Sequence, residues 1–243
     1  MRLSGRNPVV ERLRRNPSTV RRIYIQEGLN ESSFFFQKAK QWNIPLLVVP
    51  RQQMDKMARG INSQGVLVEI DEFAYADYHD ILDLTLQKGY TPVYFDGMTD
   101  PQNLGAIIRT LGCMGKFAII LPSHDSVEVT QAVLRVASGA DNFVPVAIVS
   151  NINKAIREAK KEGVTIAGAV VKDGAPIQDA SFEFPLGLVI GSEHKGIREI
   201  ILPNLDVKVT IPMYVDTLSL NVAQATTIFA YEITKQKKQK KRT

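Results

Sequence analysis

From Pro92 onward the chain alternates short apolar runs with segments of helical periodicity, and this alternation constrains the fold more than any other feature. The runs have the length of buried strands. Short apolar runs that alternate with helices are typical of a parallel β-sheet covered on both faces. Strands are expected at 93–95, 117–121, 143–149, 164–167, 186–190 and 207–211, and helices at about 104–114, 127–138, 152–162 and in the last element. The sequence therefore predicts an α/β domain.

The last strand and helix of this series surround a distinctive loop. Pro212 should end the strand, because proline supplies no amide donor to a neighbouring strand. Ser219 or Asn221 can then cap the following helix. A strand, a tight loop and a capped helix can hold polar or anionic ligands through the unpaired amides at the helix start. A simple crossover between strands is the alternative.

Residues before about 72 predict a smaller α/β/α unit. Its strands are expected at 22–25, 45–49 and 65–70, and its helices at 8–15, 31–42 and 51–59. We place the domain boundaries as follows: a first domain at 1–72, a linker at 73–90 with a helix at 78–87, a second domain at 91–235, and a basic tail at 236–243.

Positive charge is concentrated at the two ends of the chain. Seven arginines fall within the first 22 residues and six cations within the last nine, whereas the residues between them carry 17 basic and 24 acidic side chains. This distribution is expected if the ends meet a polyanion. Apolar residues interleave the N-terminal arginines, so we predict that Arg6, Arg12, Arg14 and Arg15 lie on a folded, polyanion-binding surface. For the tail, a solvated and disordered extension is an equal alternative.

The composition excludes several classes of protein. No apolar run reaches the roughly 18 residues that a membrane span needs. The single cysteine, Cys113, excludes an internal disulfide and a multi-cysteine zinc site, and it fits a reducing cytoplasm. No set of side chains has the spacing of metal ligands. Neither a P-loop nor a G-x-G-x-x-G motif is present, so nucleotide hydrolysis and conventional dinucleotide binding lose their usual support.

Three loops at the expected carboxyl ends of strands carry unusual sequences. Ligands of parallel sheets gather at this edge, so chemistry is expected after Phe95, Ile190 and Ile211. These loops contain Asn103-Leu-Gly-Ala-Ile-Ile-Arg109, then Gly191-Ser-Glu193 with Gly196, and then Ile211-Pro-Met213 with Ser219-Leu-Asn-Val222. In this order and at these separations they resemble the three motifs of the SpoU branch of the SPOUT methyltransferases, over residues 90–235.

The N-terminal unit, with its opening Gly5-Arg-Asn-Pro-Val9, is similar to the ribosomal-protein-like RNA-binding domain of family members that modify ribosomal RNA. Among the subgroups of this family, the chain resembles the RlmB type of guanosine 2′-O-methyltransferase. The resemblance implies transfer of a methyl group from S-adenosylmethionine to a ribose 2′-hydroxyl of RNA. It also implies a trefoil knot in the parallel-sheet domain and a homodimer that completes the site.

The resemblance carries individual roles to matching positions. The implied cofactor-binding residues are Gly191, Ile211 and Leu220, and the implied catalytic residues are Asn103, Arg109, Glu193, Ser219 and Asn221. An arginine is a poor proton acceptor because its pKa exceeds about 12. We therefore expect Arg109 to anchor the adjacent phosphate or to stabilise the developing alkoxide, while the polar side chains position the ribose.

Each of these residues also has an ordinary interpretation when it is taken alone. Glu193 can brace loop amides, Ser219 and Asn221 can cap a helix, and Arg109 can lie on a helix surface. Their occurrence together favours a ribose methyltransferase that acts on a guanosine of large-subunit ribosomal RNA. The alternatives are a tRNA methyltransferase and a non-catalytic RNA-binding protein of ribosome assembly.

Overall fold

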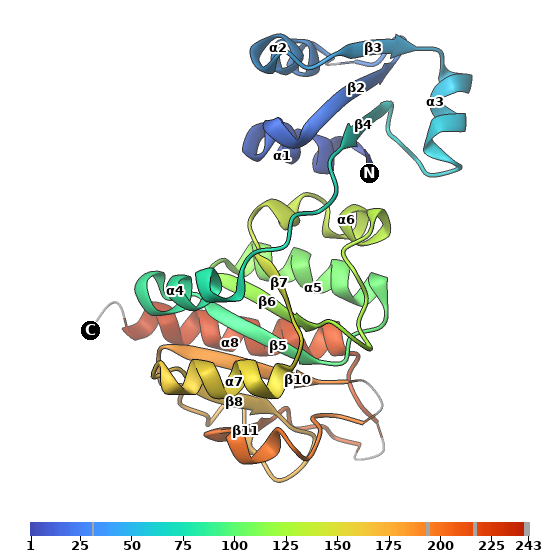
Figure 1. Ribbon diagram of the computed structural model, residues 1–243. Helices are drawn as coiled ribbons and strands as arrows, with labels where there is room; N and C mark the ends of the chain where they lie inside the picture. Colours follow the sequence, from blue (N-terminus) through green and yellow to red (C-terminus); the bar gives the residue numbers. More distant parts are fainter. Residues whose placement is uncertain (31, 193–194, 216–217, 241–243) are drawn as a thin grey trace. The chain divides into compact units, whose positions relative to one another are not determined.

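The computed structural model describes residues 1–30, 32–192, 195–215 and 218–240, and it divides the chain into two compact units. The first unit contains Met1–Ala74 and Val129–Asn142, and the second contains Tyr75–Glu128 and Phe143–Thr243. Figure 1 shows the elements of both units. In the part of the chain that is described, no helix is long and apolar enough to cross a bilayer.

The first unit is built on a four-stranded sheet with the order β1-β4-β2-β3. Strand β4 is antiparallel to both of its neighbours, and β2 is parallel to β3. Its elements before residue 75 are β1 (Arg2–Ser4), α1 (Arg6–Arg15), η1 (Pro17–Thr19), β2 (Val20–Gln26), α2 (Ser33–Trp42), β3 (Leu46–Val49), α3 (Arg51–Ala58) and β4 (Val66–Ile70). Strand β1 is not predicted from the sequence, because Leu3 is its single apolar residue and one residue has no periodicity.

Residues 129–142 complete the first unit, although in the chain they lie between two strands of the second. They form α6 (Gln131–Ala137) and η2 (Ala140–Asn142). Gly139 permits close packing on α1, since a Cβ atom at this position would lie 2.8 Å from the Cβ of Glu11. The sequence predicts the helix but contains no signal for its place in this unit. The functional division of the chain at 72 and 91 remains a prediction.

The second unit contains a seven-stranded sheet with the order β7-β6-β5-β10-β8-β11-β9, in which all neighbouring strands are parallel. This arrangement confirms the predicted fold class. The elements are α4 (Tyr78–Lys88), β5 (Thr91–Asp96), α5 (Pro101–Met114), β6 (Phe117–Pro122), β7 (Val146–Val149), α7 (Ile152–Lys161), β8 (Thr165–Ala169), β9 (Ala175–Pro176), β10 (Leu186–Gly191), η3 (Leu202–Asn204), β11 (Val207–Thr210) and α8 (Val222–Lys240).

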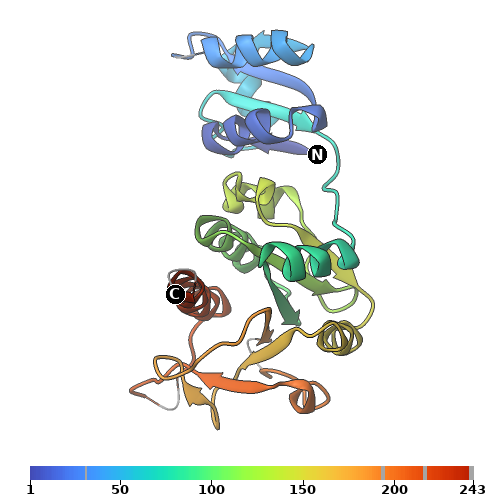
Figure 2. The same cartoon turned by 90° about the vertical axis from the view of Figure 1, so that its left-hand side faces the viewer.

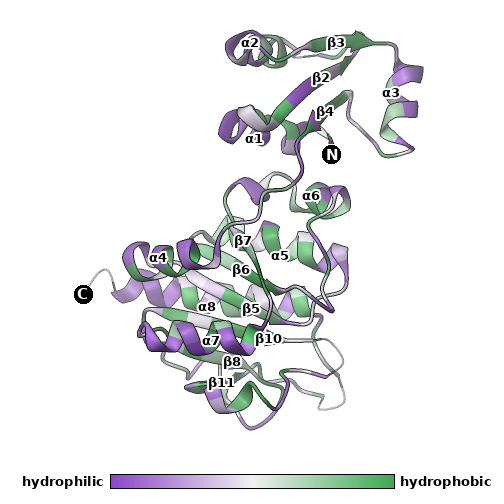
Figure 3. Cartoon of the chain, in the orientation of Figure 1, coloured by the Kyte–Doolittle hydropathy of each residue, from purple (hydrophilic) through white to green (hydrophobic). Residues whose placement is uncertain are grey.

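Helices cover both faces of this sheet. On one face, Ile81 of α4 and Ile156 of α7 pack in a buried cluster with Tyr94 and Ile120 of the central strands. Helices α5 and α8 pack against each other on the other face. Figure 2 shows the sheet between the two helix pairs, and Figure 3 shows that β6 is largely apolar. The two-sided covering explains why β6 is a continuous apolar run.

Helix α8 continues through Lys240, so residues 236–240 of the predicted basic tail are helical. The Nζ atom of Lys237 donates to the carbonyl oxygen of Gly89 at 3.0 Å, and Nζ of Lys240 donates to that of Phe182 at 2.9 Å. Gly89 is the C-terminal cap of α4, where a cation is favourable because the helix dipole is negative at that end. These lysines therefore fasten α8 to its own unit. Residues 241–243 lie outside the described part.

The phenol of Tyr78, in the first turn of α4, is buried beside that of Tyr94 in β5. The hydroxyl of Tyr78 donates to the carbonyl oxygen of Ala155 at 2.6 Å and lies 3.1 Å from the hydroxyl of Tyr94. Burial raises the pKa of Tyr78 to about 12. It also raises the pKa of Tyr94 well above its ordinary value. In the unfolded chain these phenols ionise near 10, so unfolding at high pH releases protons.

The free energy of unfolding should therefore fall as the pH rises from about 10 to about 12. Tyr78→Phe should make this fall shallower, because one of the two protected phenols is gone, and should cost about 1 kcal/mol at neutral pH through the lost hydrogen bond. Urea unfolding as a function of pH measures both effects. Tyr214→Phe, at a fully exposed side chain, is the control and should change neither. An unchanged slope in Tyr78→Phe would contradict the assignment.

Candidate functional site

Two hollows lie at the carboxyl ends of the parallel strands, where the strand order changes direction between β5 and β10. Such a change of direction is where open α/β sheets bind ligands. The apolar pocket, of about 380 Å³, follows β8, β10 and β11. The polar cleft, of about 560 Å³, follows β5, β6 and β7. The two adjoin, because Ser192, Lys195 and Val222 line both.

The apolar pocket brings together the three predicted cofactor-binding residues. Gly191, Ile211 and Leu220 all line it, although they come from two different loops. Ser219 lines it as well. Most of the remaining lining is aliphatic or aromatic, including Phe229 of α8. Such a lining suits an apolar ring held by backbone groups more than a highly charged ligand.

Gly191 is required by the path of the chain itself. A Cβ atom at this position would lie 2.0 Å from the carbonyl carbon of Gly196 and 2.2 Å from the nitrogen of Ile197. The loop is closed by two backbone hydrogen bonds between Ser192 and Gly196, of 3.1 and 2.9 Å. The glycine thus lets the loop fold back on the strand end. Glu193, a predicted catalytic residue of this loop, lies outside the described residues.

Asn103 and Asn221, predicted from separate loops, are directly bonded. The side-chain amide of Asn221 donates to Oδ1 of Asn103 at 2.9 Å. Its own Oδ1 accepts from the backbone N–H of Ala223 at 2.8 Å, so Asn221 caps α8. The sequence left the cap open between Ser219 and Asn221, and the structure selects Asn221. Asn103 is buried and lines the polar cleft, so the bond joins α5 to α8 beside both hollows.

Arg109 lies in α5, the helix that also contains Asn103, but away from the two hollows. Its side chain is exposed on α5, and among the described residues it lines neither hollow. It follows Asn103 by six positions, which corresponds to about 9 Å along a helix axis and a rotation of about 240° around it. A single chain therefore does not place Arg109 at the hollows together with the other predicted residues.

Asp96 and Arg198 form a contact at the polar cleft that sequence reasoning missed. The Asp96 carboxylate is 1% exposed at the end of β5. Its Oδ1 accepts from Nε of Arg198 at 2.6 Å, and its Oδ2 accepts from the backbone N–H of Arg198 at 2.8 Å. This pair fixes the chain that follows the Gly191–Gly196 loop. The available signal was a carboxylate that ends an otherwise apolar strand.

The predicted polyanion-binding arginines are not equivalent. Arg14 and Arg15 are exposed, and Arg6 is partly exposed, with the Arg14 guanidinium 5.5 Å from the ring centre of Phe34. Arg12 is 7% exposed and forms a short ion pair with the buried Asp141, so its guanidinium faces the interior. This corrects the prediction for Arg12. Its partner lies 129 residues away in the sequence, where no local pattern could reveal it.

Burial and the ion pair with Arg12 shift the pKa of Asp141 in opposite directions. Burial raises the pKa of its carboxyl, and the Arg12 guanidinium lowers it to a smaller extent. The net direction is upward. The Asp141 carboxylate therefore depends on Arg12 to stay charged. In turn, it neutralises the buried charge of Arg12.

Two sequence profiles match the chain. The profile of the SpoU rRNA Methylase family covers residues 91–231, and a profile described as RNA 2′-O ribose methyltransferase substrate binding covers residues 2–76. A Staphylococcus haemolyticus protein assigned to the TrmH family of tRNA/rRNA methyltransferases is 34% identical over 91% of this chain and 90% of its own. YacO of Bacillus subtilis, with the same assignment, is 29% identical over 94% of this chain and 93% of its own.

Solved structures share the fold. The SpoU methyltransferase AviRb from Streptomyces viridochromogenes, in complex with AdoMet, is 21% identical, with a TM-score of 0.81 over 98% of this chain and 90% of its own. An rRNA methyltransferase from Sinorhizobium meliloti is 24% identical, with a TM-score of 0.79 over 96% of this chain and 86% of its own. A structure described for the 2-OH methylation of C/U34 on tRNA is 24% identical, with a TM-score of 0.55, and covers 60% of this chain and 95% of its own.

Asp141→Ala should lower the free energy of unfolding by about 3–5 kcal/mol, because it leaves the Arg12 guanidinium buried without a counter-charge. The matched control is Asp71→Ala, whose partner Arg21 is largely exposed, and it should cost much less because solvent screens an exposed pair. Urea unfolding at neutral pH compares the two variants. Equal losses would mean that the buried pair contributes no more than a surface pair.

Proposed function

Because the chain belongs to the SpoU rRNA methylase family, we propose that it transfers a methyl group from S-adenosylmethionine to a ribose 2′-hydroxyl of RNA. The observation that carries this proposal is the bond between Asn103 and Asn221, which lies where the apolar pocket meets the polar cleft. A donor in the pocket and a ribose in the cleft would then lie side by side. Such an arrangement favours methyl transfer through orientation of the two reactants.

The apolar pocket fits the methyl donor. Its lining residues include no aspartate or glutamate among those described, and most of them are apolar, with Gly191, Ile211 and Leu220 among the lining. Backbone groups can recognise an adenine edge, and apolar walls can hold its ring. When bound, S-adenosylmethionine would supply a methyl group on a cationic sulfur, and its transfer to the ribose oxygen would leave S-adenosylhomocysteine and release the hydroxyl proton.

The residues of the chain act by positioning. Asn103 and Asn221 hold each other, and we assign them to the ribose, together with Ser219 at the edge of the pocket. Glu193 keeps its predicted place in the catalytic set. Arg109 holds the phosphate next to the target ribose or stabilises the alkoxide that develops on its oxygen. A guanidinium serves both purposes because it stays protonated and presents several donors in one plane.

We propose that a second copy of the chain supplies Arg109 to each site, since within one chain this side chain lines neither hollow. The proposed homodimer uses α8, which leaves Tyr231 60% exposed and Ile228 36% exposed. A trefoil knot formed by the loops around Gly191 and Ile211 belongs to the same proposal.

We further propose a guanosine of large-subunit ribosomal RNA as the target, in a loop from which the base can be turned out. The match to a substrate-binding profile over residues 2–76 supports an RNA substrate that the N-terminal region helps to bind. The coverage of the solved structures favours ribosomal RNA, since the rRNA methyltransferase covers 96% of this chain and the structure described for tRNA covers 60%. The alternative, a tRNA substrate, is supported by relatives whose names include both tRNA and rRNA.

Methyl transfer should be tested with tritiated S-adenosylmethionine on ribosomal RNA and tRNA from cells that lack this protein. We expect label on ribosomal RNA, at one ribose that mass spectrometry identifies. Label on tRNA alone would establish the alternative substrate. Binding of S-adenosylmethionine by calorimetry separates both enzymes from a non-catalytic RNA-binding protein, which would bind none.

The origin of Arg109 can be tested by complementation. Arg109→Ala and Asn103→Ala should each lose most activity alone, because each removes one part of every site. Co-expressed, they should regain about one quarter of wild-type activity, since half of the dimers are mixed and each mixed dimer has one intact site. A tagged copy of one variant confirms that mixed dimers form. If activity stays at the level of the single variants despite mixing, Arg109 acts within its own chain.

A further inference from the structure

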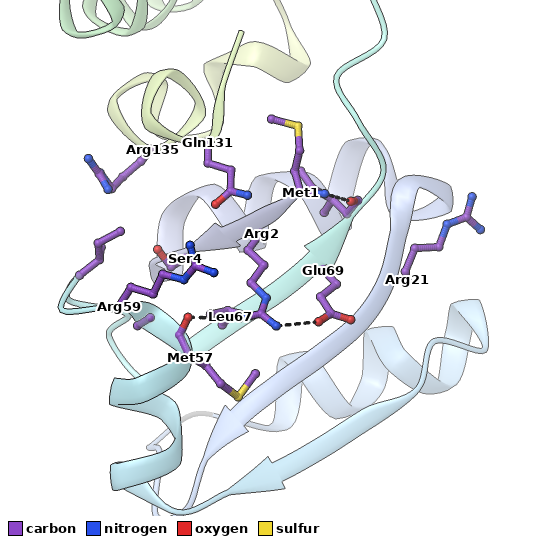
Figure 4. Close-up of a pocket in the computed structure, with 13 residues that line it drawn as sticks. Met1, Arg2, Ser4, Arg21, Met57, Arg59, Leu67, Glu69, Gln131 and Arg135 are labelled. Carbon is purple, nitrogen blue, oxygen red and sulfur yellow. Dashed lines mark hydrogen bonds and ion pairs between the residues drawn. The ribbon is translucent and has the colours of Figure 1, made fainter.

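A third hollow, of about 530 Å³, lies wholly in the first unit and has no role in the chemistry proposed above. We call it the arginine hollow and define it by Arg2, Arg59, Arg135, Gln131, Met57 and Ile61. Figure 4 shows it between β1, the end of α3 and the side of α6 that carries Gln131 and Arg135. It differs from the face of α1 that carries Arg6, Arg14 and Arg15, the arginines selected from the sequence.

The arginine hollow carries an excess of positive charge. Arg21 also lines it, so four arginines from separate elements contribute, against Glu69 as the single acid among the described lining residues. Arg2 is paired with Glu69 at 3.4 Å, and Arg21 with Asp71 at 2.6 Å. Arg59 and Arg135 have no ion pair or side-chain hydrogen bond within the described part of the chain. Two guanidinium groups are thus left to attract an anion.

Arg59 has a backbone conformation that is uncommon for a residue with a side chain. It follows α3 with a φ of 51°, in the left-handed region that glycine adopts at least cost. Figure 4 shows its side chain extending from the end of α3 toward Ser4 and Arg2. The chain therefore holds a long cation at a position where glycine would be more favourable for the backbone.

The walls of the arginine hollow are apolar beside this charge. Met57 is partly buried, and Ile61 is 38% exposed. Guanidinium groups bind phosphate oxygens in a forked geometry, and an apolar wall accepts the face of a base. A free phosphate would use only the first feature, and an acidic peptide would bring carboxylates without a flat ring. The combination fits a nucleotide unit of single-stranded RNA.

We propose that the arginine hollow binds one phosphodiester of the RNA substrate through Arg59 and Arg135, with a neighbouring base against Met57 and Ile61. This proposal rests on the proposed function, because it places part of the same RNA outside the methyl-transfer hollows. Helix α6, which supplies Arg135, lies between β6 and β7 in the sequence. Pro122 at the end of β6 and Ser150 directly after β7 line the polar cleft. RNA held here is therefore bound by the two sequence regions that the SpoU-related profiles match separately.

The test compares two double variants with equal loss of charge. Arg59→Gly with Arg135→Gln removes both cations of the hollow, and glycine suits the backbone at residue 59, so folding should be retained. Arg51→Gln with Arg157→Gln is the control, because both side chains are exposed and line none of the three hollows discussed above. The probes are a mixed-sequence single-stranded RNA 12-mer, large-subunit ribosomal RNA and inorganic phosphate.

For the hollow variant, the slope of log affinity against log salt for the 12-mer should become shallower by about 1.4, the effect of losing two phosphate contacts on a single strand. The KM for ribosomal RNA should rise about tenfold or more, with kcat and the affinity for S-adenosylmethionine unchanged. Ile61→Ser should weaken RNA binding without changing the salt slope. The control should stay close to wild type.

Binding and KM equal to those of the control would overturn the proposal. Tight binding of inorganic phosphate that RNA does not displace would also overturn it, since the hollow would then be a site for a free anion. Failure of the wild-type protein to methylate any RNA would instead remove the proposed function, while the comparison of RNA binding between the two variants would still stand on its own.

Discussion

The side chain of Asn221 holds the candidate site together. One of its atoms caps α8, and another is bonded to Asn103 near the start of α5. These helices cover the same face of the sheet, so the bond fixes the ends of both helices at the edge where the strands end. A cap is an ordinary stabilising feature of a helix. Here the same residue also precedes Val222, which lines both the apolar pocket and the polar cleft.

The loop after β10 depends on two further constraints. Gly191 lets the loop fold back against the strand end, and the buried Asp96 holds the backbone and the side chain of Arg198 after the loop. The geometry of the pocket is therefore set by the chain before any ligand arrives. Such preorganisation lowers the entropic cost of binding.

The parts of this structure that the sequence predicts are those encoded by local patterns. Apolar runs identify the parallel strands, and the edge at which those strands end brings Ile211 and Gly191 together. Contacts between distant charges leave no such pattern. The burial of Arg12 depends on Asp141, and the pairing of Asp96 depends on Arg198, 102 residues further along the chain. For this reason the fold could be predicted from the sequence, whereas the burial of Arg12 and the contact between Asp96 and Arg198 could not.

The connectivity of the first unit limits how this chain can be divided. The backbone passes between the two units after Ala74, after Glu128 and after Asn142. A fragment that stops at Ala74 would lack the carboxylate that neutralises Arg12 and would expose the surface of α1 that Gly139 covers. The N-terminal region is thus not an autonomous module, and any chimaera that exchanges it between relatives must transplant residues 129–142 along with it.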